Sequence, residues 1–155
     1  MQIQKDNDII LKSLYRYCSG SEKCRSDIEL YLHKFDLGKN EQVEVIKNLE
    51  DNNFINETRY AEAFVNDKLK FNKWGRIKIC YALKSKKIND KIIEKALATI
   101  NEDIYSEILY SVLKKKLSQI SGKEKSIQKQ LILNFGMSRG FESENIIEIL
   151  KKLRT

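Results

Sequence analysis

The sequence resembles itself three times along its length, and this internal repeat constrains the fold more than any other feature. Equivalent positions lie 51 residues apart between the first and second copies and 53 apart between the second and third. Four apolar positions recur in every copy: Ile28, Ile79 and Ile132; Leu37, Ile88 and Phe141; the pairs Val45-Ile46, Ala96-Leu97 and Ile149-Leu150; and Leu49, Ile100 and Leu153. Such a period is typical of stacked modules that bury their apolar faces against one another. We predict modules at residues 1–54, 55–101 and 102–155, with breaks near 53–56 and 101–103.

Each module is predicted to contain three helices. The chain has no proline among its 155 residues, which permits helices throughout, and no alternating strand pattern is visible. The second helices should begin near Ser21, Trp74 and Ser121, and the third near Lys39, Asn89 and Ser143. Ser121 and Glu124 have the spacing of a capping box, and Asn56 is interpreted as a helix N-cap rather than as a glycosylation site. The predicted fold is all-α: three tandem three-helix modules in an elongated, curved array.

Positive charge is concentrated in the middle of the chain. The net charge is +7, and residues 68–91 alone carry nine cations against one anion, Asp90. Such a patch is the electrostatic footprint of a protein that binds a polyanion. A lysine-rich, solvated helical surface is the alternative interpretation.

The segment "NKWGRIKICYALKSKKI", residues 72–88, carries six of these cations and no acid. On a helix, Ile79 and Leu83 would form the core stripe, whereas Ile77, Cys80 and Tyr81 would lie on another side. Either a second element covers that side or it is an interface. Trp74 is more simply a packing anchor than a platform for bases, and Gly75 would let another backbone approach closely.

Catalysis and metal binding are poorly supported by the composition. His33 is the single histidine, there is no glycine-rich phosphate loop, and the cysteines (Cys18, Cys24 and Cys80) lack metal-ligand spacing. We expect small buried or half-buried thiols, no cofactor, no metal and no catalytic residue. No apolar run is long enough for a membrane span, and "MQIQKDND" is not a signal peptide, so a cytoplasmic protein is expected.

The middle of the chain, "FINETRYAEAFVNDKLKFNKWGRIKICYALKSKKINDKIIEKAL", resembles the RecX family, the regulators of the RecA recombinase. The positions that match the family pattern are Tyr60-Ala61, Phe64-Val65, Trp74-Gly75, Lys78-Ile79, Leu83, Lys86, Ile88 and Ala96-Leu97. At the C-terminal end, "SRGFESENIIEIL" matches through Arg139, Gly140 and Phe141, followed by Ile146 and Ile149-Leu150. Looser N-terminal matches are Leu14, Tyr17 and Leu32. The resemblance covers nearly the whole chain.

The sequence departs from the family pattern at a few places. Lys73 and Lys87 each replace a glycine, and Asn56-Glu57 stands where the family has paired aspartates. Gly136 falls where the repeat has Leu32 and Leu83 in the other copies, which predicts a kinked or thinly packed helix in the third module.

The resemblance implies a non-catalytic regulator of homologous recombination, DNA repair and the SOS response. Such a protein would bind RecA, lie along the groove of the RecA–DNA filament as a monomer and inhibit its activity. The residues expected to contact the filament or DNA are Lys73, Trp74, Arg76, Lys78, Lys84, Lys86, Lys87, Lys114, Lys115, Lys116 and Arg139. The alternative is a basic helical DNA-binding protein that acts independently of RecA. Because lysines dominate, such binding would follow phosphates rather than base sequence.

Overall fold

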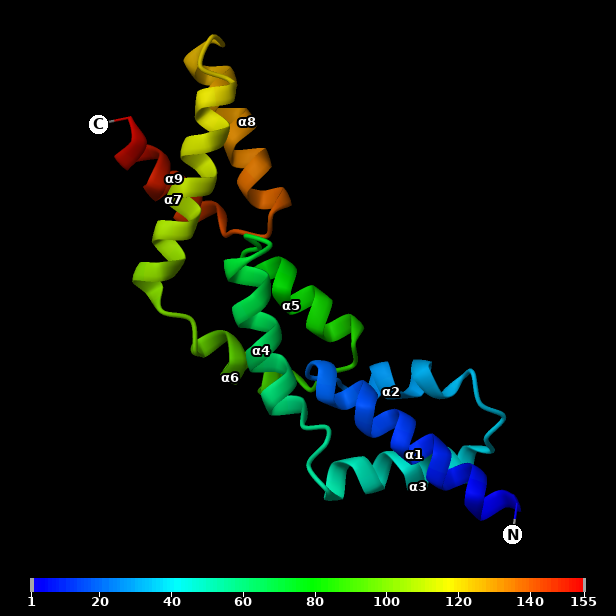
Figure 1. Cartoon of the computed structure of the whole chain (residues 1–155). Helices are drawn as coiled ribbons and strands as arrows, with labels where there is room; N and C mark the ends of the chain where they lie inside the picture. Colours follow the sequence, from blue (N-terminus) through cyan, green and yellow to red (C-terminus); the bar gives the residue numbers. More distant parts are fainter. Residues whose placement is uncertain (1, 155) are drawn as a thin grey trace.

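The computed structural model describes residues 2–154, with side chains described from residue 7 onward. Over this range it contains α-helices and no strand, as predicted (Figure 1). The helices are α1 (Gln2–Gly20), α2 (Arg25–Leu32), α3 (Lys39–Asp51), α4 (Glu57–Lys70), α5 (Arg76–Ser85), α6 (Asp90–Ala98), α7 (Glu102–Gln119), α8 (Lys125–Ser138) and α9 (Ser143–Leu153). In Figure 1, α4–α6 lie between α1–α3 at one end and α7–α9 at the other, which makes the body elongated and bent. The prediction of an elongated helical array is confirmed.

Packing follows the chain order. Helix α4 packs against α5 and α6, α7 packs against α8 and α9, and α2 packs against α3. Residues 52–56 and 99–101 separate these groups. We keep the terms first, second and third module for α1–α3, α4–α6 and α7–α9, and the residue bounds of the modules stay a prediction.

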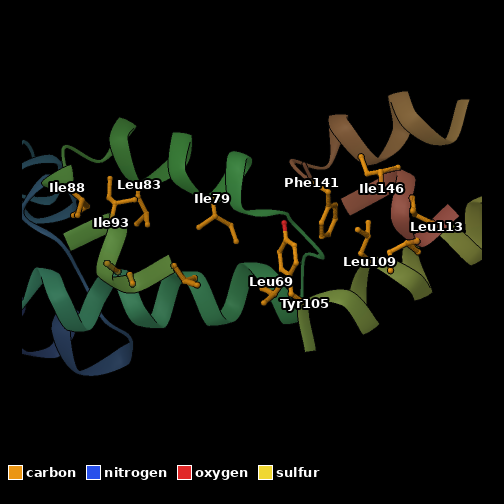
Figure 2. Close-up of a cluster of buried hydrophobic side chains, with 14 of the residues drawn as sticks. Leu69, Ile79, Leu83, Ile88, Ile93, Tyr105, Leu109, Leu113, Phe141 and Ile146 are labelled. Carbon is orange, nitrogen blue, oxygen red and sulfur yellow. The ribbon is translucent and has the colours of Figure 1, made fainter. Parts of the chain in front are cut away.

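The repeated apolar positions build the core. Ile28, Ile79 and Ile132 are all fully buried, as the repeat predicts. The side chains nevertheless form two clusters rather than three. One lies within the first module, and the other runs through the second and third, from Leu83 and Ile79 to Tyr105, Phe141 and Leu113 (Figure 2). The second and third modules therefore share one continuous apolar core, which Cys24 of the first module also joins.

Some helices begin where the sequence predicts and others do not. Asn56 caps α4 as predicted, its Oδ1 accepting a hydrogen bond from the Arg59 N–H at 2.9 Å. The third helices begin at or next to their predicted residues. The capping box at Ser121 is wrong: the Ser121 hydroxyl donates to the Ser118 carbonyl at the end of α7, and Glu124 is the N-cap of α8. Residues 121–123 are used to turn the chain, so α8 begins later than predicted.

The lysines that replace family glycines keep a backbone conformation that favours glycine. Lys73 has φ 56° and Lys87 has φ 60°. Lys87 ends α5 in a Schellman motif, in which the Ile88 N–H donates to the Leu83 carbonyl and the Lys87 N–H to the Lys84 carbonyl. Gly140, with φ 93°, ends α8 in the same way. The hydrogen bonds that end the helix require a left-handed residue at this position. Lysine can adopt that conformation, but with more strain than glycine.

Gly136 does not kink or thin the third module. Helix α8 is continuous through it, and Gly136 is buried. A Cβ added there would lie 2.6 Å from Ile146 Cδ1. The expectation of thin packing is wrong because the Ile146 side chain fills the volume that leucine occupies in the other modules.

Candidate functional site

The two glycine-containing motifs, far apart in the sequence, meet in space. The Gly75 N–H donates to the Arg139 carbonyl at 2.8 Å, and the Ile77 N–H donates to the Gly140 carbonyl at 3.0 Å. A Cβ added to Gly75 would lie 2.3 Å from the Gly140 oxygen. The expected close backbone approach at Gly75 is therefore confirmed, and its partner is the Arg-Gly-Phe turn of the third module. We call this meeting of the two backbones the glycine joint.

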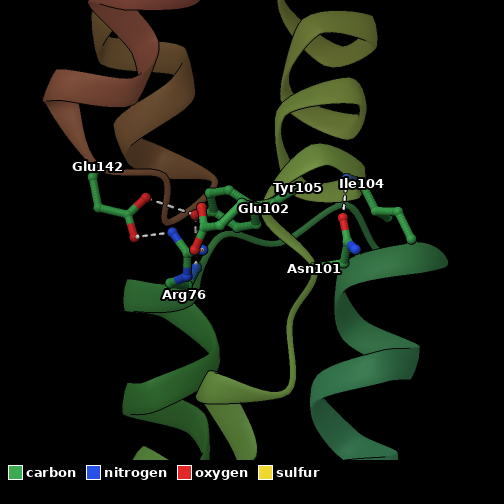
Figure 3. Close-up of polar contacts among 6 residues, drawn as sticks. All are labelled: Arg76, Asn101, Glu102, Ile104, Tyr105 and Glu142. Atoms are coloured by element: carbon green, nitrogen blue, oxygen red, sulfur yellow. Dashed lines mark hydrogen bonds and ion pairs between the residues drawn. The ribbon is translucent and has the colours of Figure 1, made fainter.

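A polar network completes the joint (Figure 3). The Tyr105 hydroxyl donates to Glu142 Oε2 at 2.7 Å and accepts from the Arg76 N–H at 3.1 Å. The Arg76 guanidinium lies 3.9 Å from the centre of the Tyr105 ring, and its two terminal nitrogens reach Glu102 at 2.5 Å and Glu142 at 3.3 Å. The hydroxyl of the buried tyrosine and the charge of the arginine are thus both satisfied within the protein.

The ionisation of these groups follows from their surroundings. Burial raises the pKa of the Tyr105 phenol above its usual value, so it stays a neutral donor. Burial alone would lower the pKa of Arg76, but Glu102, Tyr105 and Glu142 raise it overall. Arg76 therefore remains a cation whose charge is already balanced within the protein.

Arg139 also serves the joint. Its guanidinium donates to the Asn72 carbonyl, which ties the end of α8 to the loop before α5. Two of the predicted contact residues, Arg76 and Arg139, thus lie together at the joint. There they hold two modules in contact.

Lys86 links the first and second modules. Its ammonium lies 2.7 Å from Asp27 Oδ1, and its carbonyl accepts from the Ser26 hydroxyl at 2.7 Å. Burial by itself would raise the pKa of Asp27, but Lys86 and the Cys24 N–H together hold it below its usual value. Asp27 in turn raises the pKa of Lys86. Lys86, a third predicted contact residue, therefore forms an ion pair within the protein.

The remaining cations around α5 face solvent. Lys84 and Lys87 are exposed, and Lys73 is half-buried. None of these three forms an ion pair within residues 7–154. Lys78 lies with its ammonium 4.6 Å from the centre of the Trp74 ring. Trp74 itself is half-buried and packs against the shared core, so it acts as the anchor that the sequence predicts.

The three lysines of α7 form a separate group. Lys114 and Lys115 are exposed, whereas Lys116 is half-buried with its ammonium 5.1 Å from the Phe135 ring. They lie on the distal half of α7, apart from α5 (Figure 1). The lysines of α7 therefore form a basic surface separate from the cations around α5.

The second apolar side of α5 is uncovered. Tyr81 is 72% exposed and Ile77 46% exposed, and with Cys80 and Leu97 of α6 they line an open hollow of about 310 Å³. The helix is therefore apolar on two sides, as predicted; on the second side Cys80 still packs against the core, whereas Ile77 and Tyr81 are left exposed.

The sequence did not indicate the residues that neutralise the cations. Glu102, Glu142 and Asp27 are not among the positions that match the family pattern, and they lie far along the chain from the cations that they bind. The same holds for Tyr105, which hydrogen-bonds Glu142 and the Arg76 N–H. A basic residue next to Gly75 or Gly140 was the only available sign that a structural role was possible.

Other kinds of site are scarce. Within the described residues, no group of three histidine, cysteine or acidic side chains is placed to hold a metal ion. Cys24 is buried and the other two cysteines are half-buried, as predicted, while His33 is exposed at the end of α2. No helix between residues 2 and 154 has the length and apolar character needed to cross a membrane.

Comparison with known proteins places these features in a family. The family profile described as the second three-helix domain of RecX matches residues 56–97. The regulatory protein RecX of Clostridium acetobutylicum is 30% identical over 156 residues, which cover 97% of this chain and 72% of that protein. The Clostridium tetani protein of the same name is 32% identical over 111 residues, 70% of this chain and 50% of that protein. This chain thus spans most of one relative and about half of the other.

The fold agrees with solved structures. The crystal structure of RecX from Lactobacillus salivarius superposes with a TM-score of 0.87 and covers 97% of this chain and 98% of that one, at 24% identity. A second crystal structure, titled regulatory protein RecX, gives a TM-score of 0.85 over 94% of this chain and 71% of that one, at 19% identity. Because both structures are less than 25% identical to this chain, they establish the fold alone. The Clostridium acetobutylicum protein, at 30% identity over 97% of this chain, establishes the family. The chain belongs to the RecX family of regulatory proteins.

Proposed function

We propose that the protein is a non-catalytic cytoplasmic regulator that binds the RecA–DNA filament as a monomer and inhibits its activity. The family membership over nearly the whole chain carries this proposal. The geometry adds an elongated helical body suited to a long groove and a set of cations that form no ion pair with any other side chain between residues 7 and 154. These features favour a polyanionic surface as the partner.

The contact surface that we propose contains fewer residues than the set expected from the sequence. Arg76, Lys86 and Arg139 already serve the contacts between modules, and Trp74 serves the core. The remaining cations can meet phosphates or acidic side chains: Lys73, Lys78, Lys84, Lys87, Lys114, Lys115 and Lys116. Because lysine contacts phosphate without reading base edges, binding should not depend on DNA sequence.

Charge reversal on α5 tests the proposal. The variant K84E/K87E should weaken binding to RecA filaments on single-stranded DNA, measured by fluorescence anisotropy, and should reduce inhibition of strand exchange. If each lysine neutralises one phosphate, the slope of log K against log salt should fall in magnitude by about 0.7–0.9 for each lysine replaced. Helix content should not change, because glutamate and lysine have similar helix propensities.

The matched control is K47E/K151E, which makes the same change in net charge at exposed positions on α3 and α9. Equal loss of affinity in both variants would mean that only bulk charge matters and that α5 has no special role. Tighter binding to naked DNA than to the RecA filament would instead favour a DNA-binding protein that acts without RecA.

A further inference from the structure

The uncovered side of α5 is a surface that folding does not require. The three modules offer an internal comparison, because their core positions are equivalent while their other positions differ. Where α5 has Ile77, the first and third modules have Ser26 and Gln130. Where α5 has Tyr81, they have Leu30 and Asn134. Where α5 has Cys80, they have Glu29 and Leu133, so each of these modules keeps one apolar residue at the three positions and the second module has three. The larger apolar cluster in the second module therefore needs another reason.

The hollow has a definite chemical character. Six side chains line it: Arg76, Ile77, Cys80, Tyr81, Lys84 and Leu97. None of the six is acidic. Arg76, at one end, is neutralised by Glu102 and Glu142, so the unbalanced charge lies at the opposite end, on Lys84. The hollow is therefore apolar in its centre and cationic at one end.

The aliphatic lining favours a protein partner over a nucleic acid. Single-stranded DNA binds through bases stacked on several aromatic rings along a basic groove. Here Tyr81 is the one aromatic side chain in the lining, and Ile77 and Leu97 offer surface that stacks poorly but buries an apolar side chain well. Exposed apolar patches with a polar rim are typical of protein interfaces.

We propose that this hollow binds a segment of a partner protein in which an apolar side chain is accompanied by carboxylates. The apolar side chain lies against Ile77 and Tyr81, and a carboxylate meets Lys84. This inference rests on the proposed function, because it makes the α5 hollow the protein-binding part of the regulator and leaves phosphate contact to the lysines around it and on α7.

The test uses the full chain and two fluorescein-labelled probes. One is a short peptide of glutamate with leucine at every third or fourth position, and the other is oligothymidine. The variants Ile77→Ser and Tyr81→Ser should each weaken peptide binding about tenfold or more, as expected for the centre of an interface. Oligothymidine binding should change less than about twofold, because no phosphate contact is removed.

Phe71→Ser is the matched control, because Phe71 is 79% exposed and lies outside the hollow. It should leave peptide binding unchanged. Lys84→Gln should weaken peptide binding and make it less sensitive to salt. Since all these residues are exposed or half-buried, unchanged circular dichroism should confirm that the variants fold.

Three outcomes would overturn the inference. The wild-type chain could fail to bind the peptide with a Kd below about 1 mM. Phe71→Ser could weaken binding as much as Tyr81→Ser. Tyr81→Ser could lose oligothymidine along with the peptide, which would make the hollow a stacking site for bases. Because these titrations contain no RecA, their failure is separate from failure of the proposed function, which the filament assay measures.

Discussion

Replacing Gly75 with alanine should separate the second and third modules at their most closely packed point. The new Cβ would lie 2.3 Å from the Gly140 oxygen and 2.4 Å from Phe141 N. Both are backbone atoms, so no side chain can rotate away and the joint itself must open. Opening it strains the two hydrogen bonds from the Gly75 and Ile77 N–H groups.

The magnitude follows from three contributions. Overpacking at a closely packed site costs about 1–3 kcal/mol. Two strained or broken backbone hydrogen bonds add about 1 kcal/mol each. Alanine reduces the entropy of the unfolded chain, which offsets about 0.4–1 kcal/mol. We therefore expect Gly75→Ala to lower the free energy of unfolding by about 2–5 kcal/mol.

Urea denaturation followed by circular dichroism measures this change. With a slope of about 1–3 kcal/mol per molar urea, the midpoint should fall by about 1 M or more. Gly122→Ala is the matched control, since an added Cβ there meets no atom within 4 Å. It should shift the midpoint little. If Gly75→Ala is no less stable than Gly122→Ala, the glycine joint does not hold the modules together.

Three further predictions concern strain, the buried network and pH. Lys87→Gly should stabilise the protein by about 0.5–1 kcal/mol in urea denaturation, because it removes the backbone strain of a lysine held at φ 60°. Lys84→Gly, within the regular part of α5, should destabilise the protein by about 1 kcal/mol. A change of the same sign in both variants would contradict the argument. Tyr105→Phe should lower the free energy of unfolding by about 1–3 kcal/mol, because it leaves Glu142 Oε2 and the first amide of α5 without their hydrogen-bond partner. An unchanged midpoint would show that water replaces the hydroxyl. Asp27→Asn should lower stability at pH 7 by about 1 kcal/mol, a figure discounted for the exposure of Lys86. Since the folded pKa of Asp27 is depressed, its contribution is present above the unfolded pKa of about 3.9 and is lost as pH falls through the folded value. Wild type and variant should therefore converge in acid, and a gap that persists there would implicate packing instead of charge.

The sequence alone predicted the helical modules and the residues that fill them. Ile28, Ile79 and Ile132 are all buried because the second helix of each module packs in the same register and needs an apolar residue at the same place. Helix caps such as Asn56 were also predictable, since they depend on neighbours a few residues away. Gly136 was misjudged because the side chain that fills its space, Ile146, comes from another helix.

Only the tertiary structure decided which cations are free to bind a partner. Arg76, Lys86 and Arg139 are basic residues like Lys84 and Lys87, and apart from the glycine next to each arginine nothing in their local sequence distinguishes them. Their partners lie tens of residues away in the chain, on other modules, and become neighbours only when the glycine joint and the contact between the first two modules form. The charge of a segment is a property of its composition, whereas the free charge on a surface depends on which opposite charges the fold brings within a few ångströms. The sequence therefore determined where positive charge is concentrated, and the packing of the modules determined how much of it remains for a partner.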